Sequence, residues 1–230
     1  MEREIILDTE TTGLDPIIGH RIIEIGCVEL INRIPTGKVY HSYINPEREV
    51  PQEAFNIHGI STDFLKDKPK FSEIVDEFVE FISDSKLVIH NAEFDIKFLN
   101  HHLFNAKKND IGRDRVFCTL LYARKKFPGQ QNSLDALCKR FNIDTSRRVK
   151  HGALLDSEIL AEVYLELMGG KQNTINLEQK KEKIKEEETT QQNIVNFRSR
   201  KFEVSAEEIT LHNSLAEKIP NSLWNKIPKN

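Results

Sequence analysis

Short strand-like runs alternate with helix-like runs as far as about residue 168, and this alternation is the strongest constraint on the fold. The strand-like runs cover residues 4–7, 21–31, 38–45, 86–91 and 115–119, and the helix-like runs cover residues 71–83, 92–104, 120–127, 133–141 and 152–168. A Pro-Thr-Gly turn separates the second and third strands, which predicts an antiparallel start. The pattern predicts an α/β fold, with a mixed β-sheet flanked by helices.

The composition changes after Gly169 and Gly170. Residues 171–201 are dominated by mixed charges, which predicts a flexible linker, although a charged helix is an alternative for its middle third. Residues 202–230 regain apolar side chains, and Ser205 and Glu208 have the spacing of a helix capping box. This segment is too short to fold alone, so we expect a partner to complete its core. The predicted divisions are therefore 1–170, 171–201 and 202–230.

Length and charge exclude several classes of protein. The 230 residues, 38% of them hydrophobic, suit one domain with an appendage, and a net charge of −3 argues against binding nucleic acid by bulk electrostatics. Three widely separated cysteines suggest neither a disulfide framework nor a zinc site, so we expect a reducing cytoplasm. No segment approaches the roughly 18 apolar residues of a membrane span, and we expect no membrane partner.

Two acids follow the first apolar run. Asp8 and Glu10 are expected at or just past the end of this strand and, being two residues apart, on one face of it. Two adjacent carboxylates raise one another's pKa unless a cation neutralises them, and such a pair suits a hard divalent metal. A solvated strand end with two exposed acids is the alternative interpretation.

Two more acids are predicted on helices. Asp95 shares a face with apolar residues of its helix, with Asn91 as a candidate N-cap, and Asp156 begins the buried stripe of the last predicted helix. His151 lies five residues before Asp156 on an expected loop, where an ordinary surface histidine is the alternative. Loops of an α/β sheet converge on one edge, so these residues are expected to meet. Two divalent ions roughly 4 Å apart would clamp the attacking and leaving oxygens of a phosphoryl displacement, with histidine as the base.

Three motifs resemble those of the DEDDh exonucleases in order and spacing. They are DTETTG at residues 8–13, HNAEFD at 90–95 and HGALLD at 151–156. The resemblance covers residues 1 to about 168 and implies an RNase H-like fold with 3′→5′ exonuclease activity. It implies two Mg²⁺ or Mn²⁺ ions held by Asp8, Glu10, Asp95 and Asp156, with His151 as the general base.

The resemblance also implies substrate contacts at the 3′ end of single-stranded DNA. The metal ligands Asp8, Glu10 and Asp156 belong to this set, joined by Thr9, Thr11, His58 and Phe94. A turn histidine and a core phenylalanine are the alternatives for His58 and Phe94. The basic run at residues 147–150 is a candidate phosphate contact or simply a solvated face.

The tail resembles that of the proofreading epsilon subunits of bacterial DNA polymerase III, a branch of this family. This implies attachment to the polymerase alpha subunit, with Leu211, Leu215, Leu223 and Trp224 as anchors, and a possible place for a small accessory subunit. Gln172, Ile175 and Leu177 resemble a sliding-clamp peptide, with residues 192–197 as a weaker candidate and plain linker as the alternative. A free-standing DEDDh nuclease acting on RNA or oligonucleotide ends remains an alternative, and a non-catalytic replisome adaptor is disfavoured because all five motif positions are filled.

Overall fold

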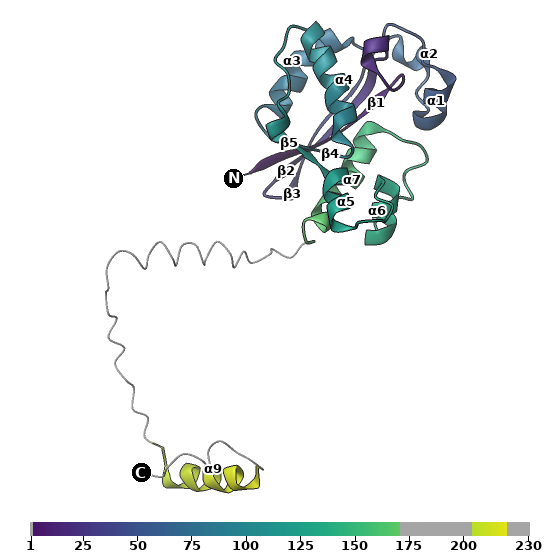
Figure 1. Cartoon of the computed structure of the whole chain (residues 1–230). Helices are drawn as coiled ribbons and strands as arrows, with labels where there is room; N and C mark the ends of the chain where they lie inside the picture. The colour runs from purple at the N-terminus through teal and green to yellow at the C-terminus, as the bar shows by residue number, and fades with distance from the viewer. Residues whose placement is uncertain (1, 171–203, 220–230) are drawn as a thin grey trace, which may run out of the picture. The chain divides into compact units, whose positions relative to one another are not determined.

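The computed structural model describes residues 2–170 and 204–219 of the chain (Figure 1). Residues 1–174 and 175–230 form two separate units. Cys27, Cys118 and Cys138 are free thiols, as the sequence predicts. No helix in the described ranges is long and apolar enough to cross a membrane.

The first unit is built on a five-stranded mixed sheet, which confirms the predicted fold class. Its strands are β1 (Arg3–Thr11), β2 (Ile22–Ile31), β3 (Ile34–Tyr43), β4 (Lys86–Ile89) and β5 (Val116–Cys118), in the order β3-β2-β1-β4-β5. β2 pairs antiparallel with β1 and β3, whereas β4 runs parallel to β1 and β5. The connection between the parallel strands β4 and β5 contains a helix, as such crossovers usually do.

Helices cover both faces of this sheet (Figure 1). α3 (Phe71–Ile82) and α4 (Ala92–Asn105) lie on one face, and α5 (Thr119–Lys126), α6 (Leu134–Phe141) and α7 (Ala153–Leu167) lie on the other. The structure adds α1 (Gln52–His58), α2 (Thr62–Leu65) and the 3-10 turns η1 (Pro16–Ile18) and η2 (Arg113–Arg115), which the sequence analysis missed. Elements this short carry too few periodic positions to be recognised by pattern.

The buried residues of β1 alternate between the two faces. Ile5 and Leu7 pack in the cluster formed with α3 and α4, whereas Ile6 packs against Leu160 and Tyr164 of α7. A strand that is covered on both faces has a continuous run of apolar residues in its sequence, and the first half of β1 has this pattern.

Two local expectations about the strands are wrong. β1 continues through Thr11 rather than ending near Leu7, because its ladder with β2 persists to the pair Thr11 and Ile22. The turn between β2 and β3 is formed by Asn32 and Arg33, both with positive φ, and the Pro-Thr-Gly sequence lies inside β3. A two-residue turn of this hand suits the twist of a hairpin.

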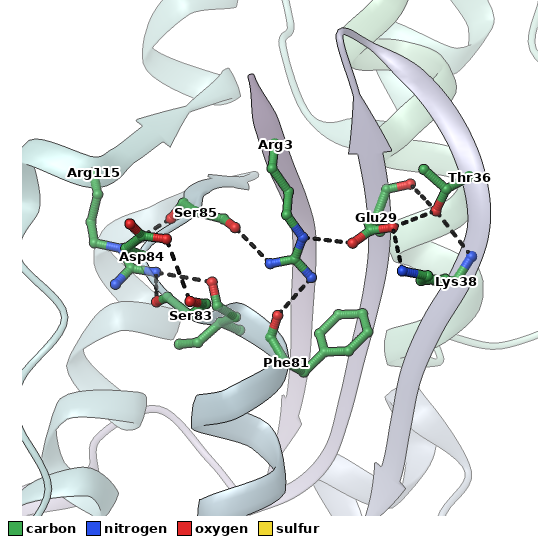
Figure 2. A network of polar contacts seen from close by, with 10 residues as sticks. Arg3, Glu29, Thr36, Lys38, Phe81, Ser83, Asp84, Ser85 and Arg115 are labelled. Atoms are coloured by element: carbon green, nitrogen blue, oxygen red, sulfur yellow. Dashed lines mark hydrogen bonds and ion pairs between the residues drawn. The ribbon is translucent and has the colours of Figure 1, made fainter. Parts of the chain in front are cut away.

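A polar network ties together the end of the sheet where β1 and β4 begin (Figure 2). The guanidinium of Arg3 donates to Oε1 of Glu29 at 2.6 Å, to Oγ of Ser85 at 2.6 Å and to the carbonyl of Phe81 at 2.8 Å. Arg115 donates to the carbonyls of Ser85 and Ile82 at 3.0 and 3.3 Å. These bonds satisfy carbonyls at the end of α3 that have no partner within the helix.

The second described segment contains α9 (Ala206–Lys218). Ser205 and Glu208 form the predicted capping box, with both reciprocal hydrogen bonds present. Ile209, Leu211 and Leu215 are exposed on this helix by 50%, 71% and 62%. A helix with this much exposed apolar surface has not buried the face that would stabilise it.

The first turn of α7 packs directly on the backbone of β2. A Cβ atom at Gly26 would overlap backbone atoms of Ala153 and Leu154. The Ser157 hydroxyl donates to the Gly26 carbonyl at 2.9 Å. Gly26 is the β2 residue paired with Asp8, so its missing side chain lets α7 approach the acidic end of β1.

We therefore expect Gly26→Ala to destabilise the protein by about 1–3 kcal/mol, because overpacking forces the helix away from the strand. Urea unfolding measures this change. Gly152→Ala is the matched control, since Gly152 has an extended φ of −160° and its added Cβ would meet Oε2 of Glu24 only at 3.9 Å. Equal stability of Gly26→Ala and wild type would show that α7 does not need this close approach.

Candidate active site

Asp8 and Glu10 lie on β1 and point to the side of the sheet that α7 covers. They share the strand face of Ile6, which packs on α7. Both residues are partly exposed. The strand therefore presents two carboxylates to the first turn of α7, as the spacing predicts.

Asp95 is held at the start of α4 by the strand that carries the first two acids. It is 3% exposed, and its Oδ1 accepts hydrogen bonds from the Thr9 amide at 3.1 Å and the Thr9 hydroxyl at 2.7 Å. Asn91 occupies the N-cap position in a left-handed conformation, but its side chain makes no capping bond. The inward direction of Asp95 is confirmed, and Thr9 fixes it.

Asp156 lies in the first turn of α7 and is also 3% exposed. Leu160, Val163 and Leu167 are buried with it, so the predicted stripe is confirmed. Arg148 neutralises this carboxylate, with Nε 2.5 Å from Oδ1 and Nη2 2.7 Å from Oδ2. The contact between Nε and Oδ1 is an ion pair without the direction of a hydrogen bond, so Oδ1 of this buried acid accepts no hydrogen bond.

His151 lies on the segment between α6 and α7, as predicted. Its Nδ1 is 3.1 Å from Oδ2 of Asp156 and 2.7 Å from Nη2 of Arg148, and its side chain is 45% exposed. Ligand atoms of Glu10, His151 and Asp156 all lie within 4.8 Å of one another. The structure thus brings acids from β1 and α7 together with the histidine.

The pKa values of three of the acids are raised, first by burial and, at Asp8 and Glu10, also by the charges of neighbouring acids. Burial, followed by the charges of Asp95, Glu10 and Asp156, raises the pKa of Asp8 well above its usual value. Burial, followed by the charges of Asp156 and Glu24, raises the pKa of Glu10 to about 8. Burial raises the pKa of Asp95 to about 7, although its bonds with Thr9 oppose the change. A bound cation would relieve this repulsion.

This donor set fits hard divalent cations. Carboxylate oxygens are the ligands that Mg²⁺ and Mn²⁺ prefer, and the raised pKa values of Asp8 and Glu10 indicate that these acids lack sufficient compensating positive charge. Asp8, Glu10, Asp95 and Asp156 are therefore suited to hold metal, with His151 beside them.

Glu24 is a fifth acid that the sequence analysis missed. It is 2% exposed and pairs across the sheet with Glu10. Its Oε2 accepts from the Ala153 amide at 3.1 Å, and its Oε1 is 2.7 Å from Nε2 of His41. Glu24 thereby satisfies the start of α7, the helix that carries Asp156. The signal was available, since an acid within a strand apolar on both faces is unusual.

A cleft opens beside these residues. Asp8, His151 and Asp156 line it together with His90, Arg124 and the segment from Gln130 to Asp135. His90 belongs to the second motif but was assigned no role from the sequence. Its Nδ1 is 2.9 Å from the Thr119 hydroxyl, and burial, followed by the charge of Arg124, lowers its pKa to about 4. His90 is therefore a neutral polar group at physiological pH.

The predicted substrate residues differ in their surroundings. His58 is 6% exposed, its Nδ1 accepts from the Ile60 amide at 3.0 Å, and its Nε2 has no hydrogen bond. Phe94 is partly buried, with its ring centroid 5.1 Å from that of Phe98. The Thr9 hydroxyl is directed to Asp95, and that of Thr11 donates to the Gly13 carbonyl at 2.6 Å. Both threonine hydroxyls thus donate within the protein.

The basic run does not form one surface. Arg147 lies 3.8 Å from Glu158, and Lys150 lies 4.9 Å from the centroid of the Phe55 ring. Arg148 is 8% exposed and joins Asp156 to Asp135. Of the predicted tail residues, Leu211 and Leu215 lie on α9, whereas Leu223, Trp224, Gln172, Ile175 and Leu177 fall outside the described residues, as do residues 192–197.

The raised pKa values predict a pH dependence. In chelator the folded chain holds protons that the unfolded chain has released between about pH 5 and 8, so stability should fall as pH rises through this window. We expect a loss on the order of 2 kcal/mol, which saturating Mn²⁺ should abolish. Urea unfolding at pH 5.5 and 8 measures it. Glu10→Gln should flatten the dependence and the exposed Glu53→Gln should not, whereas a wild-type stability that rises over this window would refute the repulsion.

Comparison with known proteins agrees with this geometry. A family model described as "Exonuclease" matches residues 5–164. DNA polymerase III subunit epsilon of Rickettsia conorii is 61% identical over 178 residues, covering 76% of this chain and 77% of its own. The Escherichia coli K12 subunit of that name is 54% identical over 176 residues, covering 73% and 72%.

Solved structures show the same fold. Exonuclease X in complex with 5′ overhanging duplex DNA has a TM-score of 0.57 and 27% identity, covering 72% of this chain and 90% of its own. The nuclease domain of 3′hExo, a DEDDh family member bound to rAMP, has a TM-score of 0.63 and 19% identity, covering 75% and 95%. The chain therefore belongs to the exonuclease family, in the branch of the DNA polymerase III epsilon subunits, which are proofreading 3′→5′ exonucleases.

Proposed function

We propose that the chain removes mispaired nucleotides from DNA 3′ ends, binding the end as a single strand and hydrolysing it at the site of Asp8, Glu10, Asp95 and Asp156. The observation that carries this assignment is the convergence of these acids from β1, α4 and α7, three of which, Asp8, Glu10 and Asp95, have raised pKa values. Two Mg²⁺ or Mn²⁺ ions held by these residues would stabilise charge on the attacking and leaving oxygens.

His151 is suited to act as the general base. Asp156 lies 3.1 Å from its Nδ1, but Nη2 of Arg148 donates to the same atom at 2.7 Å, so Nδ1 can donate to Asp156 and leave Nε2 as the acceptor only when Arg148 moves away. The side chain is 45% exposed, so Nε2 can meet a water molecule without rearrangement of the core. The carboxylate would also stabilise the imidazolium formed when His151 takes the proton.

Binding of the terminal nucleotide is assigned to residues around the acids. The Nε2 atom of buried His58 has no partner, and an unpaired polar atom in such a position favours a ligand. Phe94 keeps part of its ring surface exposed, which suits stacking on a base. Thr9 acts through Asp95, while Asp8, Glu10, Asp156 and the backbone near Thr11 contact the scissile end.

The tail is assigned to assembly. The exposed apolar residues of α9 support binding of residues 202–230 to the polymerase alpha subunit, with Leu211, Leu215, Leu223 and Trp224 as anchors. Residues 171–201 would serve as a tether, in which Gln172, Ile175 and Leu177 bind the sliding clamp. A small accessory subunit completes the proposed assembly, which would work in the bacterial cytoplasm. The alternative is a free-standing nuclease that acts on RNA or oligonucleotide ends.

The proposed roles separate in two variants. Asp8→Asn should lower hydrolysis of an oligodeoxynucleotide by at least about a thousandfold and weaken Mn²⁺ binding, because it removes a ligand. His151→Gln should lower kcat by about 10²–10⁴-fold but leave Mn²⁺ affinity within about threefold. Calorimetry and single-turnover kinetics measure the two effects. Asp110→Asn, at an exposed position outside the cleft, is the control, and near-normal turnover in Asp8→Asn would disprove the assignment.

The division near Gly170 is testable by truncation. A fragment ending at Gly170 contains every proposed active-site residue and should hydrolyse DNA at a rate within about twofold of the full chain, because catalysis depends on local geometry. It should not bind the alpha subunit. In the full chain, Trp224→Ala should weaken that binding by about 2 kcal/mol or more, since buried aromatic residues dominate interfaces. Equal binding by fragment and full chain would move the attachment surface into residues 1–170 and favour the free-standing nuclease.

A further inference from the structure

The segment between α5 and α6 forms one wall of the cleft. Gln130, Gln131, Asn132 and Ser133 line the cleft in which Asp8, His151 and Asp156 also lie. Neither His58 nor Phe94 is among the described residues that line this part of it. The wall therefore belongs to a different part of the substrate path from the proposed terminal-nucleotide contacts.

Arg140 of α6 holds this wall from behind. Its Nη1 donates to Oδ1 of Asn132 at 3.2 Å, and its Nη2 donates to Oε1 of Gln130 at 2.8 Å and to the Gln131 carbonyl at 3.0 Å. Its guanidinium carbon lies 4.4 Å from the centroid of the Phe127 ring. Arg140 itself does not line the cleft. One guanidinium thus contacts four residues of the segment, a geometry that a lysine cannot reproduce.

Asn132 connects Arg140 to the backbone of the wall. It is 6% exposed, and its Nδ2 donates to the Phe127 carbonyl at 3.2 Å and the Gln130 carbonyl at 2.8 Å. The Phe127 carbonyl also accepts from the Gln130 amide at 3.4 Å, and the bonds from Asn132 reinforce this turn. The shape of the wall therefore depends on Arg140 and Asn132 rather than on regular secondary structure.

The wall and its neighbour Arg124 offer chemistry suited to a phosphodiester. Arg148, the other arginine of the cleft, is paired with Asp135 and Asp156, whereas Arg124 has no ion pair within the described part of the chain. An exposed cation beside amide groups binds backbone phosphate without reading base sequence. Because the substrate of a 3′→5′ exonuclease extends only to the 5′ side of the scissile bond, a cation that lines the cleft and belongs to no metal-binding group is suited to the strand on that side.

We propose that Arg140 is a positioning residue that fixes this wall to hold the DNA strand on the 5′ side of the scissile bond, through phosphate contacts that include Arg124. The proposal rests on the proposed exonuclease function and adds a second region of substrate binding to it. A DNA strand reaching the site has phosphates beyond the one attacked, whereas an ester of a single nucleotide has none.

The test compares two substrates with the full chain. One is a single-stranded oligodeoxythymidylate, and the other is the p-nitrophenyl ester of thymidine 5′-monophosphate, in which nitrophenol replaces the strand. In Arg140→Met the KM for the oligonucleotide should rise about tenfold while kcat stays within about threefold. For the ester, the kcat/KM of Arg140→Met should stay within about twofold of the wild-type value. Arg140→Lys should remain impaired on the oligonucleotide, because it keeps the charge but lacks the fork.

Lys139→Met is the matched control, because Lys139 is the exposed neighbour of Arg140 on α6 and does not line the cleft. Arg124→Met should reduce the slope of log KM against log salt by about 0.7, as expected for one lost phosphate contact on a single strand. For Arg140→Met, the Mn²⁺ affinity tests whether the acids are intact, and thermal unfolding tests whether the fold is as stable as in the wild type.

Equal losses on both substrates, or a fall in Mn²⁺ affinity, would show that Arg140 supports the acids or the fold and would overturn the proposal. Unchanged oligonucleotide KM in Arg140→Met would show that the wall does not bind the strand. Failure of the wild-type chain to hydrolyse either substrate would instead contradict the proposed function, so the two failures are distinguishable.

Discussion

Burial of carboxylates beside one another at one edge of the sheet is the constraint on which the rest of the structure depends. Burial raises the pKa values of Asp8, Glu10 and Asp95, and the charges of neighbouring acids add to the effect at Asp8 and Glu10, so the fold holds these groups where ionisation is costly. Thr9 restrains Asp95, and Arg148 neutralises Asp156. Holding these acids together lowers the stability of the protein without bound cations, as expected for a site that is preorganised to bind them.

The energy that holds the acids together comes from packing elsewhere. β1 is buried on both faces, between the cluster around α3 and α4 and the cluster around α7. Gly26 and Ser157 bring the first turn of α7 onto β2, and Glu24 satisfies the amide of Ala153 at its start. At the opposite end, Arg3 joins β1 to Glu29 and to the end of α3. A rigid sheet anchored at both ends can therefore keep like charges within reach of one another.

The cleft has two walls that are stabilised differently. The acids sit on β1, α4 and α7, which are regular elements with buried faces. The segment from Gln130 to Ser133, which lines the same cleft, is irregular and is held by the side-chain bonds of Arg140 and Asn132. This division lets the chemistry rest on a rigid scaffold while strand contacts rest on a segment whose shape a few side chains determine.

Local patterns in the sequence were enough to predict the mixed sheet, its major helices, the four acids and His151, because hydrophobic periodicity and motif spacing are local properties. They could not place Glu24, His90 or Arg140, whose roles depend on contacts across 129, 29 and 8–10 residues. They also placed the end of β1 too early, since strand length follows from pairing with β2. The sequence by itself determined which chemical groups are present and on which elements. Only the tertiary structure decided which of them meet, because burial, charge repulsion and close approach at Gly26 arise between elements distant in the chain.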